Sequence, residues 1–107
     1  MNEPEDISAA DASALKDRGA QIVDIREPNE WATGVISGAA FAPLSGLDAH
    51  RLEGPNDKAV IFHCKGGART RANAEALKVK ADGRACYLLA GGIDGWRAAG
   101  LPITQPT

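Results

Sequence analysis

The sequence predicts an α/β domain with a central parallel sheet of about five strands and helices on both faces. Short apolar segments that suit buried strands alternate with helix-compatible stretches along the chain. Glycine and proline residues separate these segments. One apolar segment, Ala59–Phe62, leads through a glycine-containing loop straight into a helical stretch. This strand–loop–helix order is typical of parallel sheets that are covered on both faces.

The first half of the chain is expected to hold two strands and three short helices. Ser8 and Asp11 resemble a capping box in which Asp replaces the usual Glu, so a helix should begin there. It should run to about Arg18 and end at Gly19. Proline suits the first turn of a helix and closes a strand. The elements that follow are a buried strand at Gln21–Ile25, a short helix from Pro28 to Trp31, a short strand at Ala39–Ala42 closed by Pro43, and a short helix at Leu44–Leu52.

The second half repeats the alternation after a turn at Gly54–Asp57. Two apolar runs suit strands, and the stretches after them have helical character. The expected elements are a central strand at Ala59–His63, a helix at Thr70–Lys80, a turn at Asp82–Gly83, a strand at Ala85–Leu89, and a helix at Ile93–Ala99 that ends at Gly100.

Length and composition indicate one domain. The 107 residues are 44% hydrophobic and 24% charged, as in an ordinary globular protein, and we expect a single domain over 1–107 with its core at 6–103. Residues 104–107 suit a tail or a linker. The net charge of −2 argues against nucleic-acid binding. No apolar run is long enough to span a bilayer and no secretory signal is visible, so we expect a cytoplasmic location.

The loop that follows the central strand carries the main functional signal. Cys64 ends the apolar run, and Gly66 and Gly67 let the next residues turn their amides inward around the sulfur. The start of a helix and nearby cations, Lys65 and Arg69 among them, favour the thiolate, which is the nucleophilic form. The alternative is a cysteine that packs as a small hydrophobe. Packing alone requires neither the glycines nor the cations.

Two further motifs flank this loop. Val23–Trp31 (VDIREPNEW) ends a strand in Asp-x-Arg before an acidic residue and an aromatic one. Leu89–Trp96 (LAGGIDGW) precedes Ala99–Pro102 near the end of the chain. With His63–Thr70 between them, the three motifs resemble in order the signatures of the rhodanese family, over about Gln21 to Ile103. With Ala42–Ser45 (APLS) added, the chain most resembles the cytoplasmic rhodanese domain of a bacterial inner-membrane sulfurtransferase, in which membrane helices follow the domain. The chain is then either a free-standing soluble member or a domain whose anchor lies beyond Thr107.

The resemblance implies a thiosulfate sulfurtransferase without a metal or organic cofactor. Cys64 would take sulfur from thiosulfate as a persulfide and pass it to cyanide or a thiol acceptor. The resemblance gives the role of donor binding to Lys65, Gly66, Gly67, Ala68, Arg69 and Thr70. Non-enzymatic docking domains share the fold, but they often lack the cysteine.

Loop length separates sulfur chemistry from phosphate chemistry. Protein tyrosine phosphatases place five residues between the cysteine and the arginine, and phosphatase-like rhodanese relatives have a seven-residue loop. Here four residues separate Cys64 from Arg69. The shorter loop should enclose a persulfide, so phosphate-ester or arsenate chemistry is the disfavoured alternative.

Other residues are expected to support the loop. Asp24 and Arg26 should form a structural ion-pair network with Glu30, as the resemblance also implies, although they could instead reach the rim of the site. His63 should point away from the face that Cys64 addresses and pack behind the loop, the alternative being that it tunes the thiol. Cys86 is expected to be a buried strand thiol without a catalytic role. The family commonly has Gly-His-Ile-Pro-Gly-Ala where residues 34–39 read GVISGA, so the local turn geometry is in question.

Overall fold

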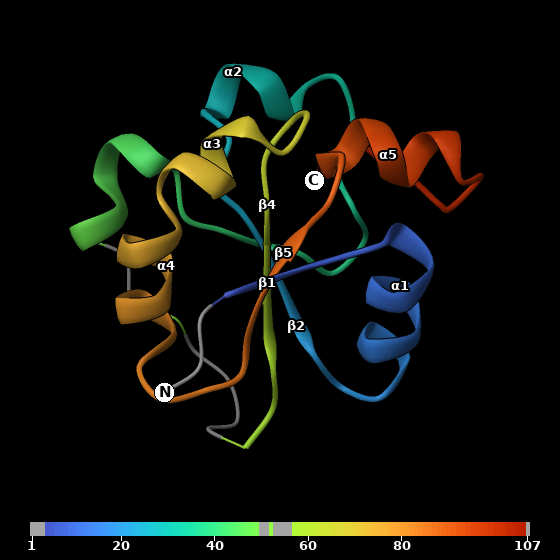
Figure 1. Cartoon of the computed structure of the whole chain (residues 1–107). Helices are drawn as coiled ribbons and strands as arrows, with labels where there is room; N and C mark the ends of the chain where they lie inside the picture. Colours follow the sequence, from blue (N-terminus) through green and yellow to red (C-terminus); the bar gives the residue numbers. More distant parts are fainter. Residues whose placement is uncertain (1–3, 50–51, 53–56, 107) are drawn as a thin grey trace.

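The fold is a five-stranded parallel sheet with helices on both faces, which confirms the predicted class (Figure 1). The computed structural model describes residues 4–49, 52 and 57–106. The strands lie in the order β1-β5-β4-β2-β3, and every neighbouring pair is parallel. Their bounds are β1 Glu5–Ile7, β2 Gln21–Asp24, β3 Ala40–Phe41, β4 Val60–His63 and β5 Cys86–Leu89.

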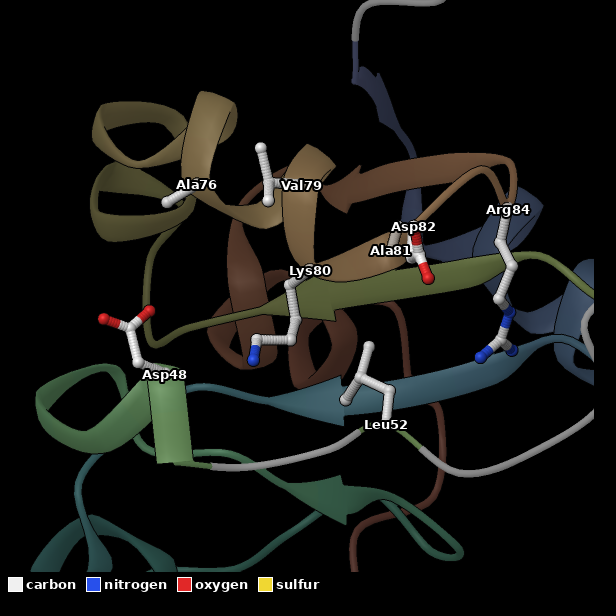
Figure 2. Close-up of a pocket in the computed structure, with 8 residues that line it drawn as sticks. All are labelled: Asp48, Leu52, Ala76, Val79, Lys80, Ala81, Asp82 and Arg84. Atoms are coloured by element: carbon white, nitrogen blue, oxygen red, sulfur yellow. The ribbon is translucent and has the colours of Figure 1, made fainter.

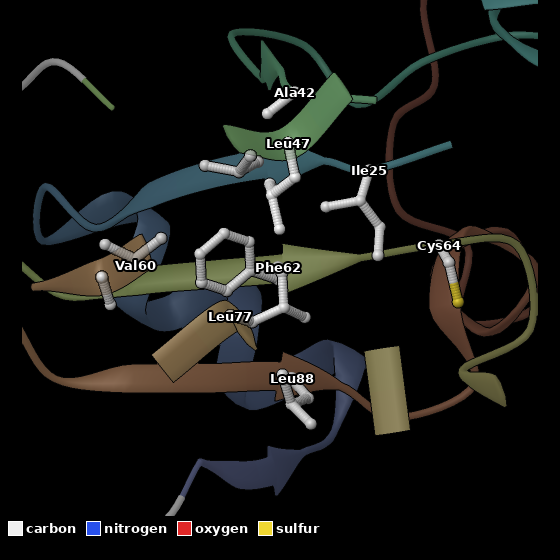
Figure 3. Packing of buried hydrophobic residues seen from close by; sticks show 10 residues of the cluster. Ile25, Ala42, Leu47, Val60, Phe62, Cys64, Leu77 and Leu88 are labelled. Atoms are coloured by element: carbon white, nitrogen blue, oxygen red, sulfur yellow. The ribbon is translucent and has the colours of Figure 1, made fainter. Parts of the chain in front are cut away.

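Helices cover the two faces of the sheet with separate apolar clusters. The helical elements are α1 Ala9–Asp17, α2 Pro28–Trp31, the 3₁₀ element η1 Leu44–Ala49, α3 Ala68–Ala72, α4 Ala74–Ala81 and α5 Gly92–Ala98. On one face, Ala12 of α1 and Trp96 of α5 pack on β-strand residues such as Ile61. On the other face, Leu47 of η1 and Leu77 of α4 pack around Phe62 (Figure 3). β4 is central and buried along its length, so the loop that follows it has a rigid base.

The amino-terminal end adds a strand that the sequence pattern did not reveal. β1 is an edge strand of three residues, and only Ile7 is buried, because Glu5 and Asp6 are exposed. So short and acidic a segment has no alternating pattern to detect. The next expectation is confirmed, since the Ser8 hydroxyl caps α1 by accepting from the amide of Asp11 at 3.1 Å.

The single helix predicted for Thr70–Lys80 is wrong. It begins earlier, at Ala68, and it is broken at Asn73 into α3 and α4. The Asn73 side-chain amide donates to the Arg69 carbonyl at 2.8 Å, and its backbone N–H contacts the carbonyls of both Arg69 and Thr70. An asparagine that bonds the preceding turn in this way competes with regular helix geometry. α3 is therefore a short helix that belongs to the loop.

Smaller differences concern the segment after β3 and the end of the chain. The helix expected at Leu44–Leu52 is a 3₁₀ element that ends at Ala49 and is kinked at Gly46. Residues 50–51 of that expectation, and residues 54–56 of the expected turn at Gly54–Asp57, lie outside the described residues. Thr104, expected in a tail, forms an antiparallel bridge with Val35. In the described part of the chain, no helix combines the length and apolar character that crossing a bilayer requires.

Candidate active site

Cys64 lies directly after β4, at the carboxyl end of the sheet. Ligands of open α/β sheets bind at this end. Only 1% of the residue is exposed, and it belongs to the same apolar cluster as Ile25 and Leu77, on the α4 face (Figure 3). One side of the thiol thus packs against apolar side chains, as expected for a cysteine that serves only as a small hydrophobe. The sulfur also has polar neighbours in the loop.

The loop turns a backbone donor toward the sulfur. The Gly67 amide donates to Cys64 Sγ at 3.1 Å, and Gly67 adopts the left-handed region with φ of 99°. The Thr70 hydroxyl lies 3.9 Å from the same sulfur and donates to the Gly67 carbonyl at 3.0 Å. The first helical bond of α3 runs from Arg71 to Gly67, so the amides of the first turn have no acceptor within the helix. This loop can hold negative charge on a sulfur that it encloses.

Arg69 at the end of the loop is held by Glu30 of α2. Its two terminal nitrogens donate to the two carboxylate oxygens at 2.7 and 2.8 Å, a bidentate ion pair between segments far apart in sequence. The hydrogen bonds from Arg69 lower the pKa of Glu30 to about 2, helped by the Glu27 amide and opposed by partial burial. Glu30 is therefore ionised at any ordinary assay pH. The Arg69 side chain is 35% exposed, so the pair lies at the surface.

Lys65 makes an exposed ion pair that the sequence analysis did not anticipate. Its ammonium group donates to Asp94 of α5 at 2.9 Å, and both side chains are half or more exposed. Such pairs contribute little to stability in water. The signal that could have revealed Asp94 is its place just after the double glycine that follows β5, at the same end of the sheet as Cys64.

Asp24 and Arg26 form a buried ion pair behind the loop. The Arg26 guanidinium donates to both Asp24 oxygens, the shortest contact being 2.8 Å, and also to the carbonyls of Gly34 and Glu30. Glu30 thus joins this pair through its backbone, while its carboxylate goes to Arg69. The contact with Gly34 helps hold the segment whose turn geometry the sequence left in question.

His63 lies fully buried between this ion pair and the backbone of the loop. Its Nδ1 is 3.1 Å from the Cys64 carbonyl oxygen, and since a carbonyl only accepts, Nδ1 carries the proton. Nε2 lies 3.7 Å from the Asp24 carboxylate and has no hydrogen-bond partner among the described residues. Burial lowers the pKa of His63, which outweighs the opposite effect of Asp24. His63 is therefore neutral and holds the carbonyl of Cys64.

Cys86 has a different environment. It begins β5 and is in register with Val60, at the far end of the sheet from Cys64. It is half-buried, less than the sequence analysis expected, and burial raises its pKa to about 11. At neutral pH it is a thiol and a poor nucleophile. Both described cysteines are free.

Two surface pockets bear on where a ligand could bind. A pocket of about 380 Å³ adjoins the loop, with Lys65 and Asp94 in its wall. A larger pocket of about 470 Å³ lies between η1 and α4, and Asp48, Val79 and Arg84 are among its lining residues (Figure 2). None of the candidate site residues lines the larger pocket, so volume alone does not locate the chemistry.

Comparisons with known proteins find relatives in both sequence and fold. The sequence profile of the family described as "Rhodanese-like domain" matches residues 8–99. A protein named sulfurtransferase from Allochromatium vinosum is 34% identical and aligns over 94% of this chain and 97% of its own length. The thiosulfate sulfurtransferase GlpE of Ectopseudomonas mendocina is 33% identical over 92% of this chain and 89% of its own. The crystal structure of a rhodanese-related protein from Thermoplasma volcanium superposes with a TM-score of 0.81 at 28% identity, over 95% and 99% of the two chains.

Proposed function

Because this chain belongs to the rhodanese-like family, whose matched members include sulfurtransferases, we propose that it transfers the outer sulfur of thiosulfate through a persulfide on Cys64. The observation that carries the proposal is the contact between the Gly67 amide and Cys64 Sγ at 3.1 Å, inside a loop closed by the pair of Arg69 and Glu30. A sulfur atom in that position has a backbone donor aimed at its negative charge.

In the first step the Cys64 thiolate attacks the outer sulfur of thiosulfate. A new sulfur–sulfur bond forms, the original one breaks, and sulfite leaves with the electron pair, so the enzyme keeps a persulfide anion. The amides of the loop from Lys65 to Thr70 would stabilise the charge on the terminal sulfur. Lys65 and the partly exposed side chain of Arg69 would attract the dianionic donor.

In the second step cyanide or a thiolate attacks the terminal sulfur. The acceptor leaves as thiocyanate or as a persulfide, and Cys64 returns to the thiolate with the electron pair of the broken bond. The two steps follow ping-pong order and use no metal or organic cofactor. Because only 1% of Cys64 is exposed, slim acceptors such as cyanide or a primary thiol suit the site best.

Two other functions compete with sulfur transfer. The loop length argues against phosphate-ester or arsenate chemistry. A docking role without catalysis would not require the Gly67 amide to donate to Cys64 Sγ. Attachment to the inner membrane, which the sequence resemblance implies for a chain longer than Thr107, stays a prediction.

Intact mass measurement tests the proposal directly. After incubation with thiosulfate the protein should gain the mass of one sulfur atom, because the persulfide is a covalent intermediate. Cyanide or a dithiol should then remove that mass. A phosphatase or a docking module would show no gain, and that result would overturn the proposal.

A second experiment separates donor binding from loop support. Arg69→Ala should lower kcat/KM for thiosulfate by about one to two orders of magnitude, the value of a charge-assisted contact of about 1.5–3 kcal/mol, and Lys65→Ala should lower it less. Arg71→Ala is the matched control, since Arg71 carries the same charge but its exposed guanidinium pairs at 3.6 Å with Asp6.

Glu30→Gln identifies how Arg69 acts. If Arg69 binds the donor, releasing it from the Glu30 carboxylate should leave KM for thiosulfate unchanged or lower. A loss in Glu30→Gln as large as in Arg69→Ala would instead assign Arg69 to holding the loop closed. Rates within a factor of two of wild type for Lys65→Ala and Arg69→Ala would mean that the backbone amides alone bind the donor.

A further inference from the structure

The active-site loop is docked on the start of α5 through its own backbone. The amide of Ile93 donates to the Cys64 carbonyl and the amide of Asp94 donates to the Lys65 carbonyl, both at 3.0 Å. The Cys64 carbonyl also receives the Nδ1–H of His63 at 3.1 Å. The first two carbonyls of the loop are therefore held on the α5 side of the sheet.

These carbonyls set the direction of the amides that follow them. The carbonyl of Cys64 and the N–H of Lys65 belong to one planar trans peptide, in which the two groups point in opposite directions. The carbonyl of Lys65 and the N–H of Gly66 are coupled in the same way. Since Cys64 belongs to the apolar cluster on the α4 face, opposite to α5, holding the carbonyls toward α5 turns both N–H groups to the side of the thiol.

Gly92 is the residue that allows this contact. A β-carbon at Gly92 would lie 2.6 Å from the Cys64 carbonyl oxygen and closer still to the Lys65 carbonyl, distances that real β-carbons do not show. The three nearest atoms are all backbone, so relief of the collision cannot come from a flexible side chain. The φ of 58° at Gly92 adds a second reason for glycine.

We infer that Gly92 is a positioning residue for sulfur transfer: it lets α5 hold the carbonyls of Cys64 and Lys65, which aims the amides of Lys65 and Gly66 at the reacting sulfur. The inference rests on the proposed function for its consequence in catalysis. The direction of the Lys65 and Gly66 amides, however, can be tested without any substrate.

Gly91 supplies a matched control at the neighbouring position. It has a similar φ, 75°, but a β-carbon there would meet only Gly95 of its own helix, at an ordinary 3.4 Å. Gly91→Ala and Gly92→Ala therefore both place alanine at a positive φ, and only Gly92→Ala collides with the loop.

The first test is the single-turnover rate of persulfide formation from thiosulfate in the folded variants, with circular dichroism as the check on folding. Re-aiming two amides should slow Gly92→Ala about 100-fold, the effect of losing one well-placed donor or more, mainly in the rate constant rather than in KM. Gly91→Ala should stay within about threefold of wild type. A folded Gly92→Ala variant as fast as Gly91→Ala overturns the inference.

A second readout does not depend on sulfur transfer. In a pH titration followed by NMR, the amide resonances of Lys65 and Gly66 should respond to ionisation of Cys64 in wild type and Gly91→Ala, with Cys64→Ser as the baseline. They should lose that response in Gly92→Ala, and a retained response overturns the inference. If wild type forms no persulfide, the proposed function fails while this comparison still decides the role of Gly92.

A third variant covers the case in which Gly92→Ala does not fold. The fragment from Cys86 onward can be synthesised and joined at Cys86, with an ester in place of the peptide bond between Gly92 and Ile93. This change removes the donor to the Cys64 carbonyl without adding volume. Persulfide formation should slow at least about tenfold, whereas an ester before Ala99, which removes only its bond to Gly95, should have little effect. Equal rates for the two esters overturn the inference.

Discussion

Replacing Cys64 with serine should abolish sulfur transfer while leaving the fold intact. Serine has nearly the same shape and can accept from the Gly67 amide, which now lies 3.1 Å from Sγ, so the loop should keep its conformation. Its oxygen cannot form a persulfide, so thiocyanate production from thiosulfate and cyanide should fall by at least about 10⁴-fold, as expected for loss of a nucleophile.

Cys86→Ser is the internal control for this result. Cys86 lies at the opposite end of the sheet, half-buried and with a pKa raised to about 11, so its removal should largely preserve turnover. Near-normal activity in Cys64→Ser, or a loss in Cys86→Ser equal to that in Cys64→Ser, would disprove the assignment of the nucleophile.

Lengthening the loop should have the second largest effect. Insertion of one alanine between Ala68 and Arg69 brings the spacing to that of the phosphatase-like relatives. The added residue separates the Gly67 amide, which contacts Sγ, from Arg69, which is anchored to Glu30, so the loop must widen. Sulfur transfer should fall at least about 100-fold, and weak binding of phosphate or arsenate is the expected gain.

The insertion should not unfold the domain, because loop closure depends only weakly on length. Thermal unfolding should confirm this, and an alanine inserted between Asp82 and Gly83, two exposed residues of a turn, is the matched control. The unmodified protein should not hydrolyse an aryl phosphate. If the lengthened loop transfers sulfur as well as the native one, loop length does not discriminate between the two chemistries, and the argument against phosphate loses its basis.

Much of the fold could be predicted because it rests on local signals. Ser8 caps α1 as its side chain predicts, and Pro28 begins α2 in the position that suits proline. The apolar run before Cys64 forms the central strand β4, and the four residues of this strand are all buried. The elements that escaped prediction have weak local signals. β1 is short and acidic, and the break at Asn73 depends on a side-chain hydrogen bond to Arg69 that competes with the helix.

For the candidate site, the sequence by itself determined which chemical groups are present and their order. It contains a cysteine at the end of a buried strand, glycines that permit an inward turn, and an arginine separated from the cysteine by four residues. The order of these residue types is a local property of the chain, and for this reason the loop could be recognised from its motif.

Only the tertiary structure decided which groups hold that loop. Arg69 pairs with Glu30, Lys65 pairs with Asp94, and Gly92 lies so close to the carbonyl of Lys65 that a β-carbon would not fit between them. These partners come from α2 and α5, which follow β2 and β5, the strands on either side of β4. Parallel strands bring their carboxyl ends to the same edge of the sheet, so residues far apart in sequence meet around Cys64. The spacing of residues along the chain does not predict these contacts, because the distance between two side chains around Cys64 depends on strand order and helix packing.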